Sequence, residues 1–358
     1  MYDQITLLYF GALAAFTVIG IILAIAPISK SIGLIDNPSE RKRHEGSIPL
    51  VGGPVIFTVF FAGMYLTNTV TNLTAWAAAG SLMLICIWDD LKGLRPTFRL
   101  LVQVIVTVII VEQLNLSISN PGFHIGSLSS PELQWAHKLL AILVIMIAIN
   151  AFNMLDGIDG LCSVTAILAL QHIAISLILI EGELTDRLTF LTIFLSGCIL
   201  GFLTFNLQKS KHRKVFLGDS GATFLGLICS LLLVFLFGGY ATEDERASTQ
   251  DYPVLALWIF ALPIADILLT SIGRLLKNRS VFSGDRSHIH HQLLDAGATP
   301  GQALTILSAC SIVMFWFGFW FTTNLGNGLS IIAFLLNLST FILLPRLTSI
   351  VFSKAKPR

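Results

Sequence analysis

Long uninterrupted runs of apolar residues place the strongest constraint on what this chain can fold into. A helix of about 17–25 apolar residues is long enough to cross the hydrocarbon core of a bilayer, and such runs follow one another along the 358 residues. The chain is 54% hydrophobic and only 12% charged, whereas soluble domains carry roughly 25% charged residues. We therefore predict an all-α membrane protein that crosses the bilayer many times and forms one domain over residues 1–358.

Eleven runs are predicted to be membrane helices. Their approximate ranges are 5–28, 50–69, 73–88, 98–114, 138–154, 161–180, 188–207, 216–237, 252–273, 303–323 and 327–345. The connections at 70–72 and 324–326 are so short that the helices on either side must be antiparallel. Residues 114–128 alternate on both sides of an Asn-Pro-Gly turn, which predicts a small β-hairpin on the outer surface.

The basic residues are distributed very unequally between the two sides of this topology. Of the 22 Lys and Arg residues, all but Lys138, Arg187 and Arg246 fall on one side. Because basic loops stay in the cytoplasm, we predict an outer N-terminus and a cytoplasmic C-terminus. The opening sequence MYDQITLLYF lacks the basic start and the cleavage site of a signal peptide, so we expect it to be retained. The five cysteines lie in or beside apolar runs without a CxxC pair and are interpreted as packing residues.

Polar motifs collect on the predicted cytoplasmic side. They are IWDDLKGLRPTFR (87–99), NAFNMLDGIDGL (150–161), KHRKVFLGDSGATFLG (211–226) and the loop segment FSGDRSHIHHQL (282–293). Each has a simpler explanation when taken alone, because Asp and Asn often cap helix ends. Basic clusters such as RKRH (41–44) are more often topology signals and headgroup contacts than sites.

Capping does not account for five acids, two asparagines and three histidines at one membrane face. Adjacent carboxylates repel each other unless a cation or a basic group lies between them. Oxygen-rich sites of this kind suit Mg²⁺, which usually takes one or two carboxylates together with phosphates and water. Interleaved Arg, Lys and His suit a polyanion, and this combination predicts phosphoryl transfer. Because the motifs lie at the lipid boundary, at least one substrate is expected to be a lipid phosphate.

Two polar residues lie inside predicted spans. Asp266 is about midway along the ninth span, where a carboxylate is costly and therefore a functional candidate. A structural partner on a neighbouring helix explains it equally well. His172 lies within the sixth span and is interpreted as a hydrogen-bonded packing residue.

In this order and spacing, the motifs from LIDNPSERKRHEGSIPLVGG (34–53) to SGDRSHIHHQL (283–293) resemble the polyprenyl-phosphate N-acetylhexosamine-1-phosphate transferases, of the glycosyltransferase family 4 type. The resemblance covers residues 34–293, and the last two helices agree in type only. It implies a Mg²⁺-dependent enzyme, with Mn²⁺ as a substitute, that joins UDP-N-acetylglucosamine to undecaprenyl phosphate and releases UMP. It also implies a bacterial inner (plasma) membrane, a cytoplasmic site and a role in making surface polysaccharide such as O-antigen.

The resemblance implies roles for individual residues. The expected metal ligands are Asp219 and Asn153, the expected catalytic residues are Asp89, Asp90, Asp156 and Asp159, and the expected substrate-binding residues are His44, Arg99, Asn150, Arg286, His288, His290 and His291. Many family members carry Lys where this chain has Arg99, which keeps the charge but replaces a point donor with a planar fork. Ile289 interrupts the three consecutive histidines of the peptidoglycan branch, and this favours the N-acetylglucosamine branch.

Several alternatives remain open at this stage. Another UDP-N-acetylhexosamine or a different polyprenol would leave the same motifs, and transfer of phospho-N-acetylmuramoyl-pentapeptide is the further alternative within the family. The sequence does not decide between a one-step and a covalent mechanism. Two alternatives belong to other classes of protein. A cation-coupled transporter usually has internal repeats and helices broken near the midplane, and the sequence contains no repeat. A lipid-phosphate binder without catalysis has no use for paired carboxylates. The expected partners are the two substrates and membrane lipid, without nucleic acid, and a homodimer is left open.

Overall fold

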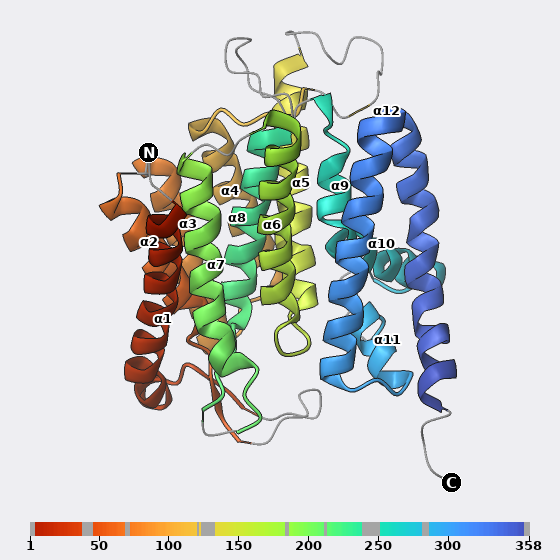
Figure 1. Cartoon of the computed structure of the whole chain (residues 1–358). Helices are drawn as coiled ribbons and strands as arrows, with labels where there is room; N and C mark the ends of the chain where they lie inside the picture. Colours follow the sequence, from red (N-terminus) through yellow and green to blue (C-terminus); the bar gives the residue numbers. More distant parts are fainter. Residues whose placement is uncertain are drawn as a thin grey trace.

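Long helices that run side by side make up most of the structure (Figure 1). This computed structural model describes residues 4–37, 46–68, 72–119, 122, 133–182, 186–210, 213–237, 251–280 and 286–353. The predicted all-α class is confirmed, because the only sheet in these ranges is one pair of two-residue strands. The first turn of helix α1 and the last turn of helix α12 lie at opposite ends of the bundle (Figure 1).

The elements follow the apolar runs closely. They are α1 (Gln4–Ile32), β1 (Ile35–Asp36), β2 (Ile48–Pro49), α2 (Gly52–Leu66), α3 (Leu73–Lys92), α4 (Pro96–Gln113), α5 (Gln134–Leu155), α6 (Leu161–Glu181), α7 (Asp186–Asn206), α8 (Gly218–Phe237), α9 (Leu255–Ile259), α10 (Ala261–Leu276), α11 (Ile289–Asp295) and α12 (Pro300–Ser353). Within the described ranges, seven helices are long and apolar enough to cross a membrane, namely α1, α4, α5, α6, α7, α8 and α12. The chain is therefore a polytopic membrane protein, while the count of eleven spans stays a prediction.

Helix α8 is buried along almost its whole length, and glycines let its neighbours approach it closely. A Cβ on Gly53 of α2 would lie 2.3 Å from the backbone nitrogen of Gly221, and a Cβ on Gly226 would lie 2.9 Å from the Cα of Ile149 in α5. Only residues without side chains allow backbones to meet at these distances. The packing places the N-terminus of α8 beside the polar ends of other helices, where the motifs lie.

The predicted ninth span, 252–273, is not one helix. It is divided at Phe260 into the short α9 and the longer α10, which turns away from the direction of α9 (Figure 1). Pro263 explains the break, because its ring lacks an N–H and clashes with the carbonyl four residues earlier, that of Ile259. The prediction of one continuous helix here was wrong, and Asp266 lies on the second of the two helices, α10.

The last two predicted spans, 303–323 and 327–345, form α12, whose two helical segments meet at Gly326. The positive φ of Gly326, 81°, turns the chain there. The segments lie side by side (Figure 1), and a hydrogen bond of 2.7 Å joins the hydroxyls of Thr322 and Ser330 across the turn. The expected antiparallel arrangement is confirmed.

Two other predictions fall largely outside the described residues. The predicted outer hairpin at 114–128 includes 120–121 and 123–128, which lie outside the described ranges, and 114–119 contain no strand. His44 also lies outside them. Which end of the bundle faces the cytoplasm likewise stays a prediction.

The packing interpretations can be tested directly. All five cysteines are described and unpaired, and four of them are buried, as expected for packing residues. His172 stacks on Phe315 with ring centroids 4.1 Å apart, which confirms its packing role. The hydrogen bond expected for its ring is absent at Nδ1 among the residues that the structure describes.

Candidate functional site

The N-terminus of α8 is held by a carboxylate from α3. Asp90 Oδ1 accepts a hydrogen bond from the Asp219 N–H (3.0 Å), and Oδ2 accepts from the Ser220 N–H (3.3 Å) and hydroxyl (2.7 Å). The first N–H groups of a helix have no partners within it and favour negative charge. Gly218 precedes them at a φ of 78°, where a Cβ would lie 2.8 Å from Asp90 Oδ2. Asp90 therefore connects the motif at 87–99 with the motif at 211–226.

Arg99 joins two further carboxylates at the same place. Its Nη1 donates to Asp89 Oδ2 at 3.0 Å and to Asp219 Oδ2 at 2.7 Å. Asp89 is buried and also accepts from the Leu94 N–H at 2.6 Å. A guanidinium between two carboxylates removes much of their mutual repulsion. We call Asp89, Asp90, Arg99 and Asp219 the carboxylate–arginine cluster.

The exposure of the cluster differs between its members. The Asp89 side chain is 7% exposed, whereas the Asp219 side chain is 44% exposed. The second carboxylate oxygen of Asp219, Oδ1, accepts no hydrogen bond from the described residues. Asp219 is therefore the carboxylate of the cluster that an outside ligand can reach.

The two asparagines of the second motif lie in the last turns of α5 and have different surroundings. The side-chain amide of Asn150 donates to Gln103 Oε1 at 3.2 Å and to the Met146 carbonyl at 2.8 Å. The Asn153 Nδ2 is buried and has no hydrogen-bond partner among the described residues. A buried N–H donor without a partner is costly, so Asn153 Nδ2 suits an acceptor oxygen of a ligand, such as a phosphate oxygen.

The two aspartates of this motif lie in the connection between α5 and α6. Asp156 follows the last turn of α5 and is exposed. Asp159 forms an ion pair with Lys214, which belongs to the segment leading into α8. This ion pair connects the second motif with the third.

Asn206, at the end of α7, was not singled out from the sequence. It is buried, accepts a hydrogen bond from the Gly160 N–H at 2.7 Å, and donates to the Val215 carbonyl at 3.0 Å. One amide thus holds both the α5–α6 connection and the segment before α8. The signal was the same as for the recognised motifs, namely a polar residue that ends a long apolar run.

The histidine motif is anchored by the acid inside the ninth predicted span. Asp266 is fully buried in α10, where its Oδ1 accepts from the Ile289 N–H at 2.7 Å and its Oδ2 lies 2.8 Å from His288 Nδ1. The sequence left two explanations for Asp266, a functional role or a structural partner on a neighbouring helix, and the structure shows such a partner. The partners are His288, directly before α11, and the N–H of Ile289, the first residue of α11, so both belong to the histidine motif.

His290 lies against the α5–α6 connection. A Cβ added to Gly157 would lie 2.0 Å from His290 Nε2, so the ring occupies the space beside that glycine. The rings of His290 and His291 are 4.2 Å apart. Both ring nitrogens of His290, and Nδ1 of His291, are buried without a hydrogen-bond partner among the described residues.

Burial sets the charge of these two rings. It lowers the pKa of His290 to about 3, helped by the neighbouring His291, and it also lowers the pKa of His291, helped by Arg286. Both rings are neutral at pH 7 and can each donate and accept a hydrogen bond. Arg286 lies at the surface in an ion pair of 2.6 Å with Asp295.

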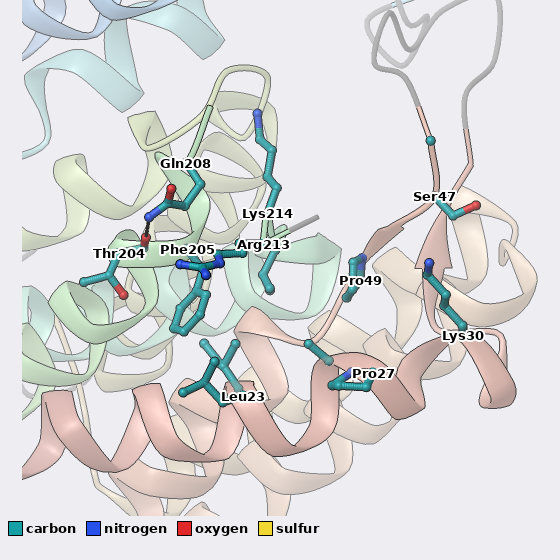
Figure 2. A pocket seen from close by; sticks show the side chains of 14 residues that line it. Leu23, Pro27, Lys30, Ser47, Pro49, Thr204, Phe205, Gln208, Arg213 and Lys214 are labelled. Atoms are coloured by element: carbon teal, nitrogen blue, oxygen red, sulfur yellow. Dashed lines mark hydrogen bonds between the residues drawn. The ribbon is translucent and has the colours of Figure 1, made fainter. Parts of the chain in front are cut away.

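A groove of about 1070 Å³ lies between α1, α7 and the segment before α8 (Figure 2). Its labelled lining combines apolar with cationic side chains, among them Leu23, Pro27, Phe205, Lys30, Arg213 and Lys214. No member of the carboxylate–arginine cluster lines it. Through Lys214 and its ion pair with Asp159, the groove borders the second motif without being the site of the acids.

The donor groups can be compared with what Mg²⁺ requires. Among the described residues, no three His, Cys, Asp or Glu side chains are placed to hold a metal ion. A protein supplies only one or two carboxylates when phosphates and water complete the shell of Mg²⁺. The half-exposed Asp219 fits such a sparse ligand set. The unpaired atom of Asn153 is the Nδ2 donor, which suits a phosphate oxygen, so only the side-chain oxygen of Asn153 could serve as a metal ligand.

The comparisons with known proteins agree with this class of site. Residues 72–237 match the family model of glycosyl transferase family 4, and the chain belongs to that family. Its relatives include three proteins named undecaprenyl-phosphate alpha-N-acetylglucosaminyl 1-phosphate transferase. The protein from Escherichia coli O157:H7 is 33% identical over 295 residues, or 80% of this chain and 76% of that protein. The protein from Salmonella typhi is 33% identical over 84% of this chain and 79% of that protein. The protein from Pasteurella multocida is 33% identical over 82% of this chain and 80% of that protein.

Proposed function

We propose that the protein transfers N-acetylglucosamine 1-phosphate from UDP-N-acetylglucosamine to undecaprenyl phosphate and releases UMP. The observation that carries this proposal is the carboxylate–arginine cluster at the N-terminus of α8, where Arg99 lies between Asp89 and Asp219. The names of the relatives support the two substrates. In the reaction, an oxygen of the lipid phosphate bonds to the phosphorus next to the sugar, and the bond from that phosphorus to the oxygen of UMP breaks.

The site's own residues meet the main difficulty of this reaction, which is to bring two anions together. A lipid phosphate is already largely ionised at pH 7, since its second pKa is about 6, so it needs little activation by a base. Arg99 and the N–H groups at the start of α8 offset part of the charge of Asp89, Asp90 and Asp219, and Lys214 offsets that of Asp159. A bound cation would supply the remaining positive potential. Neutral His290 and His291 can donate hydrogen bonds to phosphate or sugar oxygens without a change of charge.

We further propose Mg²⁺ as the cofactor, held by Asp219 and Asn153, with Mn²⁺ as a substitute. When bound, the ion neutralises charge on the diphosphate of the sugar nucleotide. Asp89 and Asp90 are assigned to the side of the acceptor phosphate, and Asp156 to the uridine side.

The proposed place of the reaction is the cytoplasmic face of a bacterial inner membrane, and the product is the first lipid-linked sugar of a surface polysaccharide such as O-antigen. The unequal distribution of basic residues supports this sidedness. A cysteine at Ser210 should be protected from a membrane-impermeant thiol reagent in intact cells, and one at Thr249 should react. The reverse labelling pattern would place the site on the wrong side for a nucleotide sugar.

The substrates are tested by incubating the purified protein with Mg²⁺, undecaprenyl phosphate and a panel of UDP-sugars, with released UMP as the readout. UDP-N-acetylglucosamine should support release, and UDP-N-acetylmuramoyl-pentapeptide should not. Turnover of the pentapeptide at a comparable rate would assign the protein to the peptidoglycan branch instead.

The metal is tested with Asp219→Asn, which keeps the shape of the side chain and removes its charge. Electrostatic stabilisation by one positioned group is worth roughly 10²–10³ in rate, so we expect at least about a hundredfold loss of turnover. Excess Mg²⁺ should restore part of it, and Mn²⁺ binding followed by electron paramagnetic resonance should weaken. Glu112→Gln, which breaks an exposed ion pair with Lys138 at the other end of α4, is the control. Unchanged Mn²⁺ affinity in Asp219→Asn would remove this residue from the metal site.

A further inference from the structure

The buried pair of Asp266 and His288 determines which ring nitrogen of His288 carries a proton. Asp266 Oδ2 lies 2.8 Å from His288 Nδ1, and on the other side Arg274 Nη2 lies 3.4 Å from His288 Nε2. A guanidinium only donates hydrogen bonds, so Nε2 must be the acceptor. The proton is then on Nδ1 and is donated to Asp266. Carboxylate, imidazole and guanidinium form one continuous chain of hydrogen bonds.

All three members of this chain are buried, with exposed fractions of 0% for Asp266, 3% for Arg274 and 9% for His288. Both ring nitrogens of His288 are occupied within the protein. Neither ring nitrogen of His290 has a partner among the described residues. The histidines of one motif therefore have different surroundings, although the sequence presents them as equivalent.

The other oxygen of Asp266 determines where α11 begins. Oδ1 accepts from the Ile289 N–H at 2.7 Å, and Ile289 is the first residue of α11. A seven-residue helix has little stability of its own, so this contact fixes the position of the helix. His290 follows in the first turn, and its ring fills the space beside Gly157. The chain of contacts thus runs from α10 through α11 to the α5–α6 connection, which carries Asp156 and Asp159.

We infer that Asp266 is a positioning residue for the transfer reaction: it holds His288 in its Nδ1–H form and sets α11 so that His290 and His291 face the sugar-nucleotide site. This assigns His288 to positioning in place of direct contact with the diphosphate. The inference rests on the proposed function, because the site it serves is the one proposed for the nucleotide sugar. Asp266 lies on α10, the helix that follows the break at Phe260.

Asp266→Asn is the informative substitution, because asparagine has nearly the same shape. If the carbonyl oxygen of the introduced asparagine still accepts the hydrogen bond from the Ile289 N–H, its NH₂ group faces His288 Nδ1. Nδ1 must then accept a hydrogen bond and cannot carry the ring proton. The ring proton moves to Nε2, where it meets the donors of Arg274. Partners that orient metal-bound histidines are typically worth roughly 10- to 100-fold, and we expect a loss of that size here. It should be expressed mainly as a higher KM for UDP-N-acetylglucosamine, with the KM for undecaprenyl phosphate unchanged.

A second substitution separates positioning from mere structural support. Arg274→Gln in the Asp266→Asn background offers a carbonyl oxygen to the Nε2–H, so it should recover part of the lost kcat/KM. Arg274→Gln alone should leave the Nδ1–H form in place, because the NH₂ group of glutamine can still donate to His288 Nε2. If Asp266 only supports folding, Asp266→Asn would lower the fraction of active protein and leave both KM values unchanged. Arg274→Gln would then restore no activity. Glu112→Gln serves again as the control for losing one carboxylate.

The tautomer itself is measured by ¹⁵N NMR of histidine-labelled protein, with His288→Gln used to assign the signal. This readout does not depend on turnover, so it separates failure of the inference from failure of the proposed function. We expect an Nδ1–H signal for His288 in the native protein and an Nε2–H signal in Asp266→Asn. Unchanged tautomer and unchanged KM values in Asp266→Asn would overturn the inference, as would equal losses without recovery by Arg274→Gln. If the native protein releases no UMP but the tautomer shifts as expected, only the proposed reaction fails.

Discussion

The close contact between Gly157 and His290 allows one added methyl group to test whether the second motif and the histidine motif act as one site. A Cβ at residue 157 would lie 2.0 Å from His290 Nε2, 2.7 Å from Cε1 and 3.0 Å from Cδ2. Ordinary contacts begin at 3.4 Å, so the ring must move by more than about 1 Å in Gly157→Ala. The backbone of Gly157 does not have a positive φ, so the effect is steric and not conformational.

The magnitude follows from the burial of the ring. His290 is 1% exposed, and overpacking a buried site typically costs ~1–3 kcal/mol of stability. A misplacement of about 1 Å can cost ~10²-fold in rate. We therefore expect Gly157→Ala to lose about a hundredfold in UMP release while its thermal midpoint in detergent falls by a few degrees at most.

Two further variants make the test specific. Gly273→Ala in α10 is the matched control, because a Cβ there meets nothing within 4 Å and alanine favours the helix. His290→Ala makes room for the added methyl group, so Gly157→Ala should cost less stability in that background than in the native protein. Native turnover and native stability in Gly157→Ala would show that the two motifs do not share a site, and the reasoning would be refuted.

Three further predictions concern the supports of the site. Asn206→Ala leaves the Gly160 N–H and the Val215 carbonyl without partners, each costing ~1–3 kcal/mol, so its thermal midpoint should fall clearly below that of the native protein. Asp90→Ala removes three hydrogen bonds from the start of α8 and should lose activity and stability together, whereas Asp90→Asn should keep more stability than activity. For His290, whose pKa falls from 6.5 to about 3 on folding, the unfolded chain binds the extra proton between these values. Stability should therefore fall as the pH drops below 6.5, by on the order of 1 kcal/mol between pH 6.5 and pH 5.5, and His290→Gln should flatten this dependence of the thermal midpoint. A native slope in that variant would contradict the assignment.

The sequence by itself determined the elements that local composition controls. Membrane segments are helical because lipid leaves no partner for unpaired backbone polar groups, and they are long because the hydrocarbon core is about 30 Å thick. The helices could therefore be predicted to within a few residues, as for α6 and α8. The candidate residues were recognisable for the same reason, because Asp89, Asp156 and Asp219 interrupt or end such runs. The family resemblance followed from these motifs, and family membership bears it out.

The tertiary structure alone decided which polar groups meet. Arg99 and Asp219 are 120 residues apart in the sequence and 2.7 Å apart in space, and nothing in their local sequence distinguishes this pairing from a contact between Arg99 and a substrate. The same holds for Asp266 and His288, which are 22 residues apart in the sequence and whose Oδ2 and Nδ1 atoms are 2.8 Å apart in space. An apolar run is defined by residues that are neighbours along the chain, so it can be recognised from the sequence alone. A hydrogen bond between side chains depends on distance and direction across helices, which packing around α8 sets and which no local pattern encodes.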